Sequence, residues 1–237
     1  MGNWQNTHLD KLLGLQSEQA LFIEIAQLAR DLGFDYCAYG LRLPLPVSNP
    51  KIVMFSNYPS AWQIQYMNND YIVIDPTVRY GAVSQLPFEW SGDIITTNHQ
   101  FWEEARAHGL NVGRAQSVHD HRGQIGMLTL ARSHEPFSDS EIGKNGLKIA
   151  SLVQMAHQGM TRVLTPKLLP ESESELTPRE VEILRWTAEG KTSDEISDIL
   201  HISVRTVNFH IGNVIRKLNT TNKLAASVKA TALGLLN

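Results

Sequence analysis

The chain lacks the features that mark secreted and membrane proteins. Its 237 residues include a single cysteine, Cys37, so an internal disulfide is excluded and a reducing compartment fits best. No apolar run reaches the length of a membrane span, and the first residues lack the basic start and the apolar stretch of a signal peptide. We therefore expect a cytoplasmic protein without membrane contact. Cys37 itself lies in an apolar segment and is expected to be a small core residue.

Signatures of catalysis and of metal binding are also scarce. We find neither a nucleophile motif nor a glycine-rich phosphate loop, so we do not expect an enzyme, a bound cofactor or a metal. The segment containing His119, Asp120 and His121 offers possible metal ligands, but it lacks a convincing third ligand nearby and reads better as a solvated hairpin turn. The clustered acidic residues and alternating strand–helix units of a phospho-receiver domain are absent from the first 165 residues.

Carboxylate side chains are absent after Asp198, although several basic residues follow. These residues are Arg205, Arg216, Lys217, Lys223 and Lys229. The net charge of −3 therefore conceals a basic C-terminal end, which is typical of proteins that bind a polyanion. A short basic stretch is also common on solvated faces, so charge alone leaves both interpretations open.

Pro, Ser and Glu are concentrated around residues 165–175, which we interpret as a linker between a first domain, 1–164, and a second, 176–237. Periodicity in the first domain predicts helices over residues 17–32, 98–110 and 138–163, and a helix that begins near Pro59. Alternation predicts strands over residues 34–43, 51–55, 111–120 and 124–133. Helices that flank a short sheet predict an α/β/α sandwich of the PAS/GAF type.

Residues 176–237 predict a compact bundle of four helices. The segments "TPRE" and "TSDE" each form a capping box, and the helix that follows Ser203 has an apolar stripe at spacings of four, three and four. That stripe consists of Val207, Ile211, Val214 and Leu218. Two short helices joined by a tight turn, the second with a basic outer face, fit a helix-turn-helix. A four-helix cap with a solvated face fits periodicity and charge equally well.

The residues themselves favour DNA binding. The segment from "LTPREVEIL" to "VNFHIGNVIRKLN" closely resembles the LuxR-type DNA-binding module over about sixty residues. Asn208 can pair with a base edge, whereas Thr206, Arg216 and Lys217 can reach phosphates. The full set of expected DNA contacts is Ser193, Arg205, Thr206, Asn208, His210, Asn213, Arg216 and Lys217.

The segment "NYPSAWQIQY" places Tyr58, Trp62 and Tyr66 four residues apart, along one side of a predicted helix. Asp75 follows inside an apolar run, where an unpaired carboxylate costs several kcal/mol. These residues either face a ligand or form a capped core in which Asp75 caps the helix beginning at Pro76. Chemistry alone leaves both possibilities open.

Here too the residues resemble a known set. Five positions match those typical of acyl-homoserine-lactone-binding domains: Trp62, Tyr66, Asp75, Trp90 and Gly113. The resemblance implies that Trp62 donates to the lactone carbonyl and that Asp75 accepts the amide N–H. It also implies that Tyr58 donates to the amide carbonyl and that Thr129 lies near that amide or near the 3-position oxygen. Tyr66 and Trp90 would wall the pocket.

Both resemblances together predict a LuxR-type quorum-sensing transcription regulator. We expect it to bind an N-acyl-homoserine lactone and, as a homodimer, an inverted-repeat site on double-stranded DNA, with RNA polymerase as a further partner. An orphan regulator that answers an exogenous lactone or another small molecule is the alternative. Ala38 and Met127 differ from some relatives, so acyl-chain length and the 3-substituent stay open.

Overall fold

The computed structural model describes residues 2–90 and 98–236. The chain divides into two compact units. The first comprises residues 1–42, 52–119 and 125–163, and the second contains residues 164–237 with two short segments, 43–51 and 120–124. No helix among the described residues is long and apolar enough to cross a membrane.

A five-stranded antiparallel sheet forms the centre of the first unit. Its strands, in the order β2-β1-β5-β4-β3, are β2 (Ile52–Ser56), β1 (Tyr36–Arg42), β5 (Ile125–Arg132), β4 (Val112–His119) and β3 (Phe88–Trp90). Three of them, β1, β4 and β5, fall within the predicted strand ranges, and β2 extends one residue beyond its predicted end, to Ser56. The fifth, β3, was not predicted because three residues are too few to display an alternating pattern.

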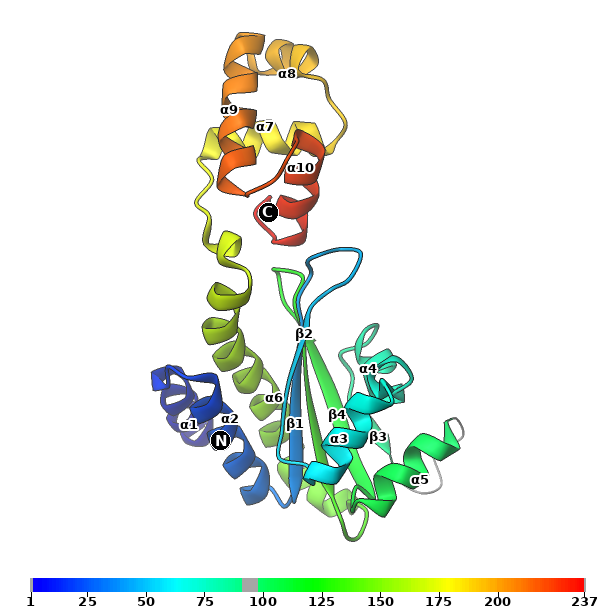
Figure 1. The fold of residues 1–237 in the computed structure, drawn as a ribbon. Coiled ribbons are helices and arrows are strands. Elements are labelled where there is room, and N and C mark those ends of the chain that lie inside the picture. The colour runs from blue at the N-terminus through cyan, green and yellow to red at the C-terminus, as the bar shows by residue number, and fades with distance from the viewer. Residues whose placement is uncertain (1, 91–97, 237) are drawn as a thin grey trace. The chain divides into compact units, whose positions relative to one another are not determined.

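Helices cover both faces of this sheet (Figure 1). On one side lie α1 (Gly2–Gly14), α2 (Glu18–Asp31) and α6 (Asp139–Leu168), and on the other lie α3 (Ser60–Asn68), η1 (Tyr71–Val73), α4 (Pro76–Gly81) and α5 (His99–Ala107). The predicted α/β/α sandwich is therefore confirmed. Helix α1 was not predicted.

The strand β1 shows how the sequence divides the two faces. Cys37, Tyr39 and Leu41 are buried towards α2 and α6, whereas the alternate residues Ala38 and Gly40 face the side of α3 and α4. Burial raises the pKa of the Cys37 thiol to about 12, so this cysteine is an inert core residue, as predicted.

The long helix α6 begins as predicted but ends later. Ser138 and Glu141 form the predicted reciprocal cap, since the Ser138 Oγ accepts the N–H of Glu141 and the Glu141 carboxylate accepts that of Ser138. The helix then continues to Leu168, five residues beyond the predicted end and into the predicted linker. Leu164 and Thr165 are buried there, and packing of this kind overrides the helix-breaking composition of the segment.

Four helices make up most of the second unit: α7 (Pro178–Ala188), α8 (Ser193–Leu200), α9 (Val204–Lys217) and α10 (Lys223–Ala232). Both predicted capping boxes are present, at Thr177 and at Thr192. All four residues of the predicted stripe on α9 are buried, so the four-helix prediction is confirmed.

An ion pair connects the start of α7 to the end of α9. The Nζ of Lys217 lies 2.7 Å from the Oε2 of Glu180, whose side chain is only 3% exposed. Burial alone would raise the pKa of Glu180, but hydrogen bonds from Lys217 and from the N–H of Thr177 outweigh it and hold this pKa below its usual value.

Replacing Lys217 with alanine leaves a buried carboxylate unpaired. We expect Lys217→Ala to destabilise the helical unit by about 2 kcal/mol, less than the roughly 3–5 kcal/mol of a fully buried pair, because Lys217 is partly exposed. Amide hydrogen exchange in α7 and α9 of the full chain should then accelerate about 30-fold.

The matched control is Lys223→Ala, because Lys223 is exposed at the start of α10. Equal exchange in wild type and Lys217→Ala would contradict the structural role of this pair. Because the pKa of Glu180 is depressed, the stabilisation is present above the ordinary carboxyl pKa and is lost as the pH falls through the lowered value.

Candidate ligand-binding and DNA-binding sites

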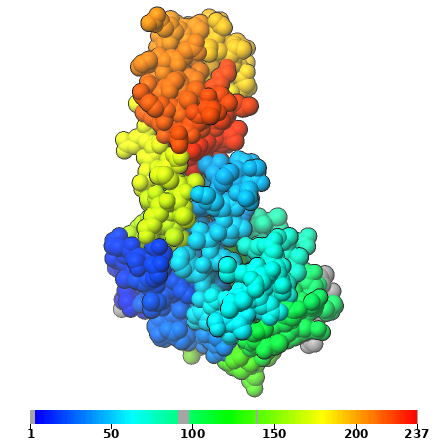
Figure 2. Space-filling model, in the orientation of Figure 1, coloured from blue at the N-terminus to red at the C-terminus, as the bar shows by residue number. Residues whose placement is uncertain are grey.

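A cavity of about 210 Å³ lies in the first unit between the sheet and the layer formed by α3, η1 and α4. Its polar and aromatic lining residues are Tyr39, Arg42, Ser56, Tyr58, Trp62, Gln63, Tyr66, Asp75, Thr77 and Thr129. The remaining lining is mostly apolar and includes Met54 on β2 and Met67 on α3, which are exposed. The segments that contain β2 and α3 lie on the face drawn in Figure 2, in light blue and cyan. The cavity therefore combines a polar cluster with an apolar channel, which suits an amphipathic small molecule.

Asp75 is the acceptor of the polar cluster and is 7% exposed. Its Oδ1 caps α4 by accepting the N–H of Thr77 at 2.8 Å and the hydroxyl of Thr77 at 2.7 Å. Its Oδ2 accepts the hydroxyl of Tyr66 at 2.9 Å. Burial raises the pKa of Asp75 above its usual value although these hydrogen bonds oppose the shift. Asp75 thus both caps α4 and lines the cavity, so the two interpretations of the sequence describe the same residue.

Three potential donors face the cavity without a protein partner. The hydroxyls of Tyr58 and Thr129 and the indole N–H of Trp62 make no hydrogen bond with another residue that the structure describes. Burial raises the pKa of Tyr58, so its hydroxyl stays protonated and able to donate. Buried polar groups are normally paired, so these donors indicate a ligand with acceptor groups.

The aromatic row differs in one respect from the prediction. Helix α3 begins at Ser60, so Trp62 and Tyr66 lie on it but Tyr58 lies in the segment that precedes it. All three residues nevertheless line the cavity. Pro59, predicted for the first turn, is the residue before that turn and has no side-chain cap.

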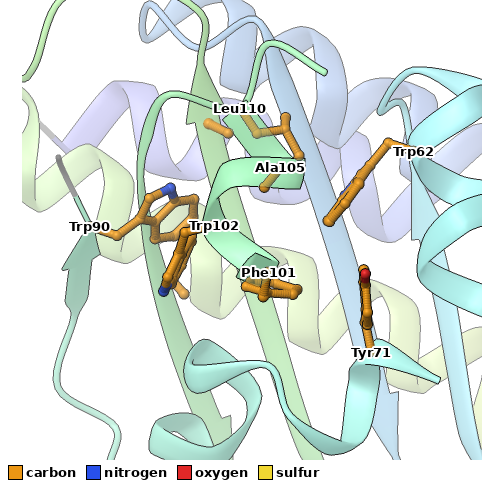
Figure 3. Packing of buried hydrophobic residues seen from close by; sticks show 9 residues of the cluster. Trp62, Tyr71, Trp90, Phe101, Trp102, Ala105 and Leu110 are labelled. Atoms are coloured by element: carbon orange, nitrogen blue, oxygen red, sulfur yellow. The ribbon is translucent and has the colours of Figure 1, made fainter. Parts of the chain in front are cut away.

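Trp62 belongs to a core of buried aromatic and aliphatic side chains (Figure 3). The ring of Trp62 lies 5.8 Å from that of Tyr71 and 5.7 Å from that of Phe101. This packing leaves Trp62 only 2% exposed and fixes the direction of its indole. Three residues that line the cavity, Tyr58, Tyr66 and Met127, pack against this core.

Trp90 belongs to this core and is not among the residues that line the cavity. Its ring lies 5.6 Å from that of Trp102, and a Cβ on Gly113 would lie 2.1 Å from its Cζ2. In this structure Trp90 packs in the core, and its predicted role as a wall of the pocket stays a prediction. The same contact explains why position 113 needs a glycine.

Sequence reasoning missed several residues of the cavity. Thr77 donates twice to Asp75, and its position two residues after a capping aspartate was the available signal. Ser56 and Gln63 gave no signal, because single polar residues on a strand or helix are usually solvated. Ala38 and Met127, which were associated with tail preference, both line the cavity.

His119 and Asp120, two of the possible metal ligands, make hydrogen bonds within the protein. The Nε2 of His119 lies 2.8 Å from the carbonyl oxygen of Gly81, and the Oδ1 of Asp120 accepts the N–H groups of Arg122 and Gln124 within the hairpin turn. Within residues 2–90 and 98–236, no group of three or more His, Cys, Asp and Glu side chains is arranged to hold a metal ion.

In the second unit, α8 and α9 form the predicted helix-turn-helix. The exposed stripe of α9 consists of Arg205, Asn208, Phe209, Gly212 and Arg216. The hydroxyl of Ser193, at the start of α8, donates to the Oδ1 of Asn208 at 2.8 Å. This bond orients the Asn208 side chain and leaves its NH₂ group free to donate. Phe209 is 64% exposed and was missed, although its position within this stripe was the available signal.

The other residues predicted to contact DNA differ in their exposure and in the hydrogen bonds they already make within the protein. Thr206 bonds to the capping Ser203, while Arg216 donates to Asn213 at 2.9 Å and is exposed. His210 is half-buried beside Phe209. Lys217 is engaged by Glu180 inside the domain, so the structure does not favour its predicted phosphate contact.

Comparisons with known proteins agree with this arrangement. The family described as "Autoinducer binding domain" matches residues 17–160, and "Bacterial regulatory proteins, luxR family" matches residues 174–230. The chain is 44% identical to the transcriptional activator protein AnoR of Acinetobacter nosocomialis over 238 residues, which cover 100% of both chains. It is 48% identical to the transcriptional activator protein SolR of Ralstonia solanacearum over 221 residues, 93% of this chain and 94% of SolR.

Its fold is similar to that of Escherichia coli SdiA. The crystal structure of SdiA matches with a TM-score of 0.84 at 34% identity and covers 99% of this chain and 98% of SdiA. The two matching family descriptions coincide with the unit that holds the cavity and the unit that holds the helix-turn-helix. The chain therefore belongs to the LuxR family of transcription regulators, with an autoinducer-binding domain followed by a DNA-binding domain.

Proposed function

We propose that this protein is a quorum-sensing transcription regulator whose cavity binds an N-acyl-homoserine lactone. The observation that carries the proposal is the polar cluster of Trp62, Tyr58, Thr129 and Asp75, which offers three free donors and one carboxylate acceptor to the cavity. An acyl-homoserine lactone carries two carbonyl acceptors and one amide N–H, so this cluster can satisfy all three groups. A relative named an N-acylhomoserine-lactone-dependent factor, CepR2 of Burkholderia cenocepacia, is 32% identical over 68% of this chain with a TM-score of 0.62.

The roles follow from the chemistry of each group. Trp62 donates to the lactone carbonyl, and Tyr58 and Thr129 donate to the amide carbonyl. Asp75 accepts the amide N–H, which offsets part of the free-energy cost of burying its carboxylate. Tyr66 holds Asp75 in place through its own hydroxyl.

The apolar channel supplies affinity for the acyl tail. Each buried methylene contributes about 0.8 kcal/mol before the cost of ordering the chain is subtracted. A ligand present at one hundred times its dissociation constant stabilises the folded domain by about 2.7 kcal/mol. Ligand binding can therefore decide how much folded regulator is present.

The DNA-binding unit acts as a homodimer on an inverted-repeat site, so that each copy places α9 in one major groove. Exposed apolar residues on α10, Leu224 and Val228, support association between copies. RNA polymerase is the partner through which such a regulator changes transcription.

A second candidate is an orphan receptor for a different acyl compound. It is favoured by a solved complex of SdiA with octanoyl-rac-glycerol, whose protein is 35% identical to this chain with a TM-score of 0.84. An acyl glycerol has hydroxyl groups and an ester but no amide, so it gives Asp75 a hydroxyl donor in place of an N–H.

A thermal-unfolding screen separates these candidates. The purified full chain is tested against lactones with acyl chains of four to fourteen carbons, their ring-opened forms, and acyl glycerols of matched length. A rise in the unfolding midpoint with intact lactones alone supports the lactone assignment. A rise with the glycerols alone supports the orphan assignment, and no rise with either series contradicts both.

The role of Asp75 in ligand binding can be tested by substitution. Asparagine caps helices about as well as aspartate, so Asp75→Asn should fold normally but should lose a charged acceptor for the ligand amide. We expect lactone affinity to fall by about 2 kcal/mol, or roughly 30-fold, as measured by isothermal titration. Asp31→Asn, on the exposed face of α2, is the control and should bind as the wild type does. Unchanged affinity in Asp75→Asn would remove Asp75 from the binding site.

Two substitutions on α9 separate base readout from phosphate contact. Asn208→Ala should reduce discrimination between a selected operator and a mutated one by about tenfold, because Asn208 pairs with a base edge. Arg216→Ala should instead weaken binding to both sequences and reduce the salt slope by about one. Fluorescence anisotropy over a range of salt concentrations measures both effects. Undiminished discrimination in Asn208→Ala would show that this residue does not read a base.

A further inference from the structure

The register of the sheet arranges the floor of the cavity in three rungs. In the first rung, Ala38 lies between Ser56 and Thr129. The second rung places Gly40 between Met54 and Met127, and the third places Arg42 between Ile52 and Ile125. All nine residues line the cavity, so it extends along β1 across all three rungs.

The polar cluster lies at the first rung, because Thr129 belongs to that rung. Beyond it in the direction of Tyr36 the space is filled, since Tyr36 and Ala131, the next pair on this face, belong to or pack against the aromatic core. A tail attached to a headgroup at Thr129 therefore has one direction open to it, along β1 towards Arg42.

Gly40 occupies the centre of this channel without a structural reason for being glycine. A Cβ built at Gly40 would meet nothing within 4 Å, whereas a Cβ at Gly126 on the neighbouring strand would lie 2.1 Å from the Nδ1 of His157. Gly40 also has no positive φ, so its backbone accepts any L-residue. A glycine within a strand that faces open space marks a place where a ligand approaches the backbone closely.

The distance between the rungs determines how many carbons of an acyl chain fit along the channel. Four residues separate Ala38 from Arg42, which corresponds to about 13 Å at about 3.3 Å per residue. Each carbon of an extended alkyl chain adds about 1.25 Å, given a C–C bond of about 1.5 Å and an angle of about 111°. A chain whose carbonyl lies at the first rung therefore passes Gly40 about five carbons beyond the carbonyl and reaches Arg42 about ten carbons beyond it.

We propose that β1 acts as a ruler for the acyl chain, with Gly40 as the residue that admits chains longer than about six carbons. The proposal rests on the proposed function in that it assigns the tail of the same ligand. Met54 and Met127 flank the chain at Gly40, and a Cβ at Gly81 of α4 would lie 2.9 Å from the sulfur of Met127, so α4 approaches the sheet closely at this rung.

The test compares chain-length profiles of wild type and Gly40→Val, measured as dissociation constants of the full chain for saturated lactones of four to fourteen carbons. The wild type should bind chains near ten carbons most tightly. In Gly40→Val the valine occupies the channel about five carbons beyond the carbonyl, so affinity for ten carbons should fall at least 30-fold. Affinity for four carbons should stay within about threefold, because the headgroup contacts are untouched.

The matched control is Gly143→Val, because Gly143 on α6 also has nothing within 4 Å of a built Cβ but does not line the cavity. Its profile should equal that of the wild type. An unchanged profile in Gly40→Val, or an equal loss at every chain length, would overturn the ruler while leaving the proposed function intact.

Acyl glycerols of the same lengths form a second series. If wild type binds glycerols but not lactones, the lactone assignment fails, and the ruler is judged on the glycerol profile by the same criteria. If wild type binds neither series, the proposed function and the ruler fail together.

Discussion

The buried carboxylate of Asp75 is the constraint on which the ligand-binding unit depends. A charge in an apolar environment is expensive, and this one is held by the start of α4 on one oxygen and by Tyr66 of α3 on the other. The two elements that roof the cavity are thus fixed to each other through one side chain. A ligand donor at the same carboxylate would join a network that already exists, so little reorganisation would accompany binding.

Behind this network, aromatic packing determines where the donors point. Trp62 can present its N–H to the cavity because Tyr71 and Phe101 confine its ring. Trp90 in turn occupies the space that the missing side chain of Gly113 leaves beside β4. Residues that never touch the cavity therefore control its geometry, as is common where a polar site is supported by a rigid core.

The sequence predicted most of this architecture because its signals were local. The stripe on α9, the capping boxes at Thr177 and Thr192, and the alternation of β1 each depend on neighbours within a few residues. The late end of α6 depended instead on the burial of Leu164. The contacts of Trp90 and Lys217 depended on residues distant in the sequence, Gly113 and Glu180. Position 40 was overlooked for the same reason, since its significance depends on register with β2 and β5.

The open space above Gly40 also has a genetic consequence. Every glycine codon becomes an alanine codon or a valine codon by a single nucleotide change, and neither side chain would meet another atom of the protein within 4 Å of its Cβ. Alanine and valine would fill the channel to different extents, and each arises by one nucleotide change without a steric clash at its Cβ. A substitution at this position would therefore change the length of the ligand tail that the cavity admits, while the residues lining the polar cluster stay the same.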